Sequence, residues 1–127
     1  MLRYYLFVAL GGALGASLRY FTYQWVERLS VLRLPVATLG VNCLGSLLAG
    51  LLFGFFTSKW DATAGPRLFF LTGMLGAYTT FSTFAVESMA LLQEGAYHKF
   101  YINILLNIVG SIGLATVGWA IARMCLK

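Results

Sequence analysis

The stretch Gly73-Met74-Leu75-Gly76-Ala77-Tyr78-Thr79-Thr80-Phe81-Ser82-Thr83-Phe84 lies in the middle of a long apolar segment, yet it suits a membrane helix poorly. Its two glycines leave the backbone unusually free, and the Ser and Thr residues that follow can hydrogen-bond to backbone carbonyls. Within a bilayer, a loosened backbone is tolerated only where protein or a water-filled cavity covers it. Transporters hold ions at such broken helices. The stretch therefore predicts either a broken helix at an ion site or a packing site of small residues.

The composition around this stretch is that of an integral membrane protein. Of the 127 residues, 60% are hydrophobic and only 10% are charged, whereas a soluble domain carries roughly a quarter charged residues. One transmembrane helix needs about 20 apolar residues. Four segments meet this need, and they cover residues 4–25, 35–56, 68–92 and 100–122. The sequence predicts an all-α membrane protein with four transmembrane helices in a single domain over residues 1–127, the third helix being broken near its middle.

Small residues recur four apart in the first two segments. The first contains Gly11, Gly12 and Gly15, and the second contains Gly50 and Gly54. Such ridges let helix backbones approach closely in lipid. We expect tight helix packing, including packing between chains, because four short helices enclose little interior of their own.

The charge of the chain is positive, with nine Lys and Arg residues against four acidic ones. In a membrane protein this excess indicates interfacial anchoring, and without a basic run we expect no nucleic-acid partner. Four crossings place both termini on one face. That face carries five basic residues and the other carries four; they are Arg3, Lys59, Arg67, Arg123 and Lys127 against Arg19, Arg28, Arg33 and Lys99. The near balance predicts insertion in both orientations, the alternative being that a weak bias still selects one.

Polar residues inside the predicted spans are candidates for function, because they are costly in a membrane. Asn42 lies about two turns into the second span, so its amide must bind another helix or a transported species. Asn103, Asn107 and Ser111 follow at helical spacing in the fourth span and form one polar stripe. This stripe either lines a pathway or holds helices together. Arg19 is either an interfacial anchor or a residue that attracts anions to a vestibule.

Aromatic and hydroxyl groups complete a central set that is neutral. Phe81 and Phe84 share a helix face, which alone indicates packing, and Glu87 lies a turn further on as a mouth residue or a structural partner for an arginine. Ring edges carry partial positive charge, and amides and hydroxyls donate hydrogen bonds. Such a lining suits a small anion stripped of water, since it replaces hydration without trapping the ion. A proton-driven carrier would instead need a central carboxylate, and the spans contain none there.

The third segment closely resembles the signature of the Fluc (CrcB-type) fluoride channels. Its matching residues are Gly76-Ala77-Tyr78-Thr79-Thr80-Phe81-Ser82-Thr83-Phe84, followed by Glu87. The resemblance extends along the chain, to Gly11-Gly12, Gly15 and Leu18-Arg19 in the first helix, Gly40-Val41-Asn42 in the second and Gly110-Ser111 in the fourth.

The resemblance implies a passive fluoride channel in the cytoplasmic (inner) membrane of a bacterium. It implies an antiparallel, dual-topology homodimer with two pores and a central structural sodium ion (Na+), held by the backbone carbonyls of Gly76 and Thr79 of each chain. Gly76 has no Cβ, so its carbonyl can turn out of the helix at little cost. The implied fluoride pathway comprises Phe81, Phe84, Ser82, Thr83, Asn42 and Ser111. Family members vary at Asn103 and Asn107, so the resemblance supports these two less.

Two other classes of protein fit the composition. A small dual-topology multidrug exporter also has four helices, but its chemistry needs a carboxylate embedded in the first helix, where this chain has only Arg19. A non-transporting membrane subunit is the other alternative. An enzyme is not expected, because the sequence offers no nucleophile–base pair and no metal cluster.

Overall fold

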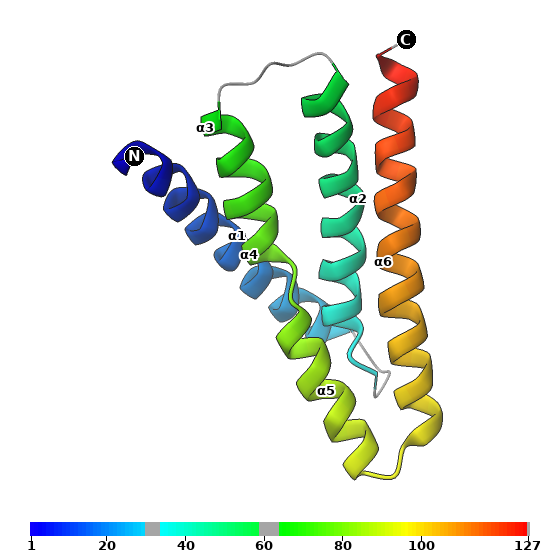
Figure 1. Ribbon diagram of the computed structural model, residues 1–127. Helices are drawn as coiled ribbons and strands as arrows, with labels where there is room; N and C mark the ends of the chain where they lie inside the picture. Colours follow the sequence, from blue (N-terminus) through cyan, green and yellow to red (C-terminus); the bar gives the residue numbers. More distant parts are fainter. Residues whose placement is uncertain (30–33, 59–63, 127) are drawn as a thin grey trace.

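The computed structural model describes residues 1–29, 34–58 and 64–126, all organised in helices and short connections (Figure 1). Arg33, Lys59 and Lys127 of the predicted charge balance lie outside these residues. The elements in chain order are α1 (Leu2–Leu29), α2 (Val36–Ser58), α3 (Ala64–Arg67), η1 (Leu68–Leu75), α4 (Gly76–Tyr78), α5 (Phe81–Gln93) and α6 (Tyr97–Cys125). Figure 1 shows α2 and α6 side by side, α1 crossing behind the third segment, and both termini at the same end.

Three stretches are helical, long enough and apolar enough to cross a membrane. They are Val36–Thr57, Ala64–Gln93 and Tyr97–Cys125, so the chain is a multi-pass membrane protein. The first predicted span is helical too, but α1 carries Arg3, Arg19, Glu27 and Arg28 along its 28 residues. Its passage through the membrane therefore stays a prediction.

The helices extend a few residues beyond the predicted spans. The last helix, for instance, begins at Tyr97 and ends at Cys125, where the apolar segment covers 100–122. Hydropathy locates the hydrocarbon region, whereas a helix continues through polar interfacial residues until its hydrogen bonding stops. At the start of α2 the Leu39 N–H donates to the Pro35 carbonyl at 3.2 Å, so Pro35 precedes the helix.

Glycine backbones form the two main helix contacts of the chain. A Cβ added to Gly15 would collide with the Met74 carbonyl, so α1 lies directly against η1. A Cβ on Gly50 would likewise meet the Ala115 carbonyl, where α2 packs on α6. The expected close packing at small residues is thus confirmed within the chain at Gly15 and Gly50, whereas a Cβ on Gly12 would meet nothing within 4 Å.

The third predicted helix is broken near its middle, as expected. Helix α4 ends at Tyr78, and α5 begins at Phe81. Between them the backbone is extended, with φ −80° and ψ 157° at Thr79, and φ −151° and ψ 113° at Thr80. Gly76 keeps regular helical angles of −61° and −35°. The expectation that Gly76 itself would turn out of the helix is therefore wrong, and the distortion lies at the two threonines.

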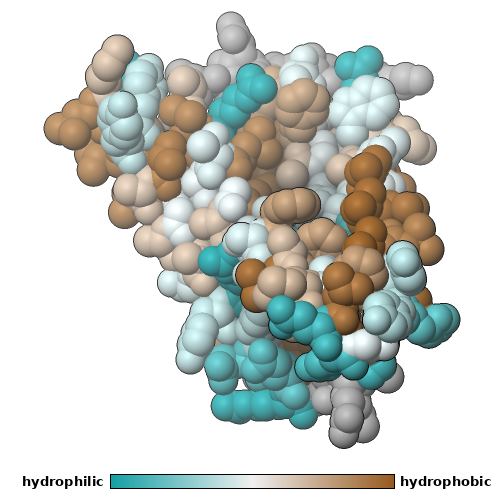
Figure 2. Space-filling view, turned by 60° about the horizontal axis from the view of Figure 1, so that its bottom comes forward, coloured by the Kyte–Doolittle hydropathy of each residue, from teal (hydrophilic) through white to brown (hydrophobic). Residues whose placement is uncertain are grey.

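The segment before the break is wound unusually wide. From Leu68 to Leu75 the chain is a π-helix, and at its end the Gly76 N–H reaches back five residues to the Leu71 carbonyl. Wide turns of this kind are frequently found at functional sites. In Figure 2 the hydrophilic surface gathers at the lower end, and hydrophobic residues cover much of the helical surface above it.

Candidate functional site

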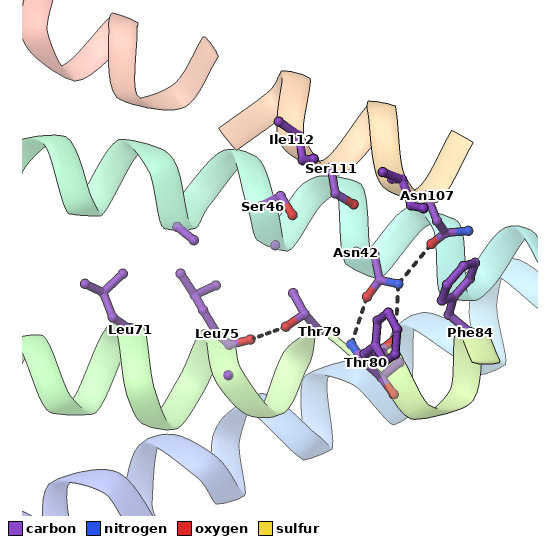
Figure 3. A pocket seen from close by; sticks show the side chains of 15 residues that line it. Asn42, Ser46, Leu71, Leu75, Thr79, Thr80, Phe84, Asn107, Ser111 and Ile112 are labelled. Atoms are coloured by element: carbon purple, nitrogen blue, oxygen red, sulfur yellow. Dashed lines mark hydrogen bonds between the residues drawn. The ribbon is translucent and has the colours of Figure 1, made fainter. Parts of the chain in front are cut away.

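A cavity of about 480 Å³ lies where α2, the broken segment and α6 meet (Figure 3). None of its lining residues among those described is ionisable. It is lined by Asn42, Gly45, Ser46, Ala49, Leu71, Leu75, Gly76, Thr79, Thr80, Phe81, Phe84, Asn107, Ile108, Ser111 and Ile112. The fold thus brings together seven residues that the sequence singled out, namely Asn42, Gly76, Thr79, Phe81, Phe84, Asn107 and Ser111.

Asn42 binds the main chain at the break from both sides. The Thr80 N–H donates to Asn42 Oδ1 at 2.8 Å, and Asn42 Nδ2 donates to the Thr80 carbonyl at 3.1 Å (Figure 3). In a continuous helix the Thr80 N–H would donate to the Gly76 carbonyl, four residues earlier. A side chain from α2 therefore replaces the helical hydrogen bond, and the break leaves no buried N–H unpaired at Thr80.

The Thr80 side chain then starts the next helix. Its hydroxyl oxygen accepts a hydrogen bond from the Thr83 N–H at 3.3 Å and donates to Thr83 Oγ1 at 2.9 Å. This is an N-cap, which satisfies one of the free N–H groups of a first helical turn. Thr80 thus fixes where α5 begins, and with it the direction of Phe81 and Phe84.

The two phenylalanines form a tilted pair in the first turn of α5. Their ring centroids are 5.6 Å apart and their planes meet at 59°. Phe84 is 7% exposed, whereas Phe81 is 78% exposed in the single chain. Phe81 therefore projects beyond this chain, toward lipid or another molecule.

The hydroxyl groups of two serines line the cavity without a hydrogen bond to any described residue. Within the described residues, Ser46 and Ser111 have no protein hydrogen-bond partner, and Figure 3 shows both oxygens directed into the cavity. The sequence analysis did not single out Ser46 as a pathway residue. Its spacing of one helical turn from Asn42 could have identified it, because the two share a face of α2.

Asn103 and Asn107 are both buried in the single chain, with 3% and 5% of their surface accessible, and Asn107 also lines the cavity. Asn107 Nδ2 donates to Asn103 Oδ1 and to the Asn103 carbonyl, each at 3.0 Å. Asn103 Nδ2 donates to Ser88 Oγ on α5 at 3.0 Å. Asn103 does not line the cavity, and both amides join helices, which was one of the two roles that the sequence left open.

Ser82, Thr83, Arg19 and Glu87 lie away from this cavity. Ser82 is exposed. Thr83 and Arg19 meet in a second cavity of about 320 Å³ between α1 and α5. Glu87 lines a third, of about 190 Å³, together with Glu27. The sequence analysis did not separate these three cavities.

Within the described residues, Glu87 accepts a hydrogen bond from a hydroxyl group. Its Oε1 accepts a hydrogen bond from the Thr38 hydroxyl at 2.7 Å, and Thr38 Oγ1 also bonds to the Tyr23 hydroxyl. Glu87 Oε2 is buried without a partner in the described residues. The sequence analysis missed Thr38 and Tyr23, and their only signal was a hydroxyl at the end of each predicted span.

The class of protein follows from this geometry: a multi-pass helical membrane protein with a neutral, donor-lined cavity at a helix break. Residues 6–119 match the model of the family described as CrcB-like protein, Camphor Resistance (CrcB). The chain belongs to this family, which is the one that its third segment resembles.

Curated relatives extend over nearly the whole chain. A protein of Legionella pneumophila (strain Lens) named fluoride-specific ion channel FluC is 43% identical over 122 residues, which cover 96% of this chain and 91% of the relative. Proteins of the same name from Vibrio parahaemolyticus and Pseudoalteromonas translucida are 44% and 43% identical. These alignments cover 89% and 87% of this chain, and 89% and 92% of the respective relatives.

Proposed function

We propose that the chain forms a fluoride-selective ion channel that passively exports fluoride across the cytoplasmic membrane of a bacterium. The observation that carries the proposal is the cavity at the helix break, which has hydroxyls, amides and ring edges but no ionisable side chain among its lining residues. A neutral lining replaces the hydration of a small anion without holding it by a full charge. The names of the relatives support fluoride as that anion.

The proposed pathway runs past the aromatic pair. The ring edges of Phe81 and Phe84 would face the ion, and Ser111 and Ser46 would donate hydroxyl hydrogen bonds. Ser82 and Thr83 would continue the pathway along α5, with Arg19 and Glu87 near its mouths. For Asn103 and Asn107 the buried amides favour helix association over a pathway role.

A second copy of the chain would complete the site. The cavity is open on one side, its lining includes amide and hydroxyl groups, and Phe81 projects from it. Polar groups at membrane depth are tolerated where protein covers them. An antiparallel, dual-topology homodimer with two pores would supply this cover, and it accords with the balanced basic residues.

The residues at the break also suit a structural sodium ion. The Gly76 carbonyl loses its usual helical donor because the Thr80 N–H binds Asn42 instead, and Gly76 is exposed. Carbonyl oxygens are suitable ligands for a hard cation. The carbonyls of Gly76 and Thr79 from two chains would hold sodium at the two-fold axis, where it would join the copies.

The decisive experiment is anion efflux from liposomes that contain the purified protein. We expect rapid, voltage-driven fluoride efflux and no chloride efflux, against protein-free liposomes as control. Equal efflux of both anions, or none of either, would refute a fluoride channel. A multidrug exporter would instead show proton-coupled drug transport, for which the described cavity offers no carboxylate.

A further inference from the structure

Three asparagines and one serine form a continuous hydrogen-bonded set, which we call the amide ladder: Asn42, Asn107, Asn103 and Ser88. Asn42 Nδ2 donates to Asn107 Oδ1 at 3.0 Å. Asn107 Nδ2 donates to Asn103 Oδ1, and Asn103 Nδ2 donates to Ser88 Oγ, each at 3.0 Å. The ladder connects α2, α6 and α5 through their side chains.

The main chain at the break sets the direction of the whole ladder. The Thr80 N–H can only donate and the Thr80 carbonyl can only accept, so Asn42 has one allowed orientation. Its second N–H hydrogen must then point to Asn107 Oδ1, which turns the Asn107 amide group toward Asn103. Asn103 is turned in the same way toward Ser88. Each amide is thus oriented by the one before it.

This arrangement uses the amide donors that an anion would need. Both Nδ2 hydrogens of Asn42 are engaged, one by the Thr80 carbonyl and one by Asn107. Asn107 Nδ2 likewise serves two oxygens of Asn103. The amide N–H groups of Asn42 and Asn107 are therefore engaged by other protein groups. Among the described residues that line the cavity, the hydroxyls of Ser46 and Ser111 remain as unengaged donors.

We propose that Asn103 and Asn107 are positioning residues, which act through Asn42 to hold Thr80 and thereby the first turn of α5 with its phenylalanine pair. The inference deepens the proposed fluoride channel and rests on it for its transport readout. Its physical basis is that the two bonds to Thr80 fix which way the Asn42 amide faces, whereas the further bonds to Asn107, Asn103 and Ser88 fix the position of that amide relative to α5 and α6. The ladder holds the break at Thr80 and α5 at Ser88, so the helix cannot shift against α2.

The test compares three variants of the full chain. Asn103→Leu removes the side-chain acceptor of Asn107 and the donor to Ser88 at similar volume, and it leaves the Asn103 backbone carbonyl as an acceptor. Asn103→Asp keeps the shape, and its carboxyl group can still accept from Asn107 and pair with the Ser88 hydroxyl. The matched control on the same helix is Thr116→Val, because Thr116 Oγ1 bonds only to the Ile112 carbonyl of its own turn.

Two readouts are measured on each variant, namely fluoride efflux and hydrogen exchange of the Thr80 backbone amide. In Asn103→Leu we expect at least tenfold slower efflux and at least tenfold faster exchange at Thr80, although the described hydrogen bonds of Asn103 go to Ser88 and Asn107 and not to Thr80. Asn103→Asp should restore both to within about threefold of the unaltered chain. Thr116→Val should change neither.

The outcomes distinguish a failure of the ladder proposal from a failure of the proposed channel function. Slower efflux with unchanged Thr80 exchange would overturn the proposal, because Asn103 would then act on the ion directly. Unchanged efflux and exchange would overturn it as well. If the unaltered chain passes no fluoride, the proposed function fails, and the exchange readout alone still decides whether the ladder holds Thr80. If Asn103→Leu does not fold, Ser88→Ala replaces it and should give the same pattern to a smaller degree.

Discussion

At the scale of single residues, the exposure of Phe81 separates its contribution to function from its contribution to the fold. With 78% of its surface accessible, Phe81 packs little within its own chain. Phe81→Ile should therefore leave the unfolding free energy nearly unchanged, while fluoride efflux is abolished or greatly slowed because the ring edge is lost. Unfolding in detergent measures the unfolding free energy, and liposome efflux measures fluoride transport. Size-exclusion chromatography checks that the protein is still assembled. An assembled Phe81→Ile protein that conducts normally would assign the ring to packing alone.

Thr38 offers a residue-scale prediction about stability. Its buried hydroxyl donates to Glu87, whose other carboxyl oxygen already has no partner in the described residues. Thr38→Val leaves the carboxyl group without this bond, which should lower the unfolding free energy by about 1–3 kcal/mol. Thr38→Ser should recover most of the loss. The control is Thr57→Val, since among the described residues the Thr57 hydroxyl bonds to carbonyls of its own helix; a loss as large there would reject the argument.

At the scale of elements, the glycines of α1 give a matched pair. A Cβ on Gly15 would overlap the Met74 carbonyl, whereas a Cβ on Gly12 meets nothing within 4 Å. Gly15→Ala should force α1 away from η1 and destabilise the chain by about 1–3 kcal/mol, the usual cost of overpacking. Gly12→Ala should stabilise it by up to about 1 kcal/mol, because Ala favours the helix. Unfolding in detergent measures both, and equal effects would contradict the close contact.

The helices and the break differ in how far they could be predicted from the sequence. Apolar length and small-residue spacing are local signals, so they predicted the helical segments and the close approach of α1 and α2 to their neighbours. The position of the break is not local. It depends on Asn42 accepting the Thr80 N–H across 38 residues of sequence, and for this reason the glycines were mistaken for the distorted residues. The roles of Ser88 and Thr38 were missed for the same reason, since each depends on a partner from another helix.

At the scale of the whole molecule, the balanced basic residues predict that copies insert in both orientations. Labels placed at the C-terminus should then be accessible from both sides of the cell membrane. Adding two or three Lys to one face should bias insertion and reduce fluoride efflux, because each chain would lack an inverted partner. Accessibility from one side only would refute the antiparallel dimer.

The proposed sodium ion makes the assembled molecule depend on a cation. An ion that binds only the dimer stabilises it by mass action, by about 2.7 kcal/mol at a hundredfold excess over its dissociation constant. Protein exchanged into sodium-free N-methylglucamine buffer should therefore lose fluoride efflux or dimer stability, and added sodium should restore them. Full efflux and unchanged melting without any small alkali cation would exclude a structural sodium ion.

Substitutions at Thr79 and Gly76 distinguish side-chain from backbone contributions to the proposed sodium site. Thr79 Oγ1 donates to the Leu75 carbonyl at 3.0 Å, so its side chain is engaged within its helix, and Thr79→Ser should bind sodium almost normally. A Cβ added to Gly76 would meet only the Leu71 carbonyl, at 3.6 Å, so the single chain has room for it. A bulky residue there should nevertheless disrupt the dimer, because in the assembly it would occupy the space of the ion and the partner. Cross-linking of Gly76→Leu in sodium buffer measures this, and a normal yield of dimer would place the two-fold contact somewhere other than the helix break.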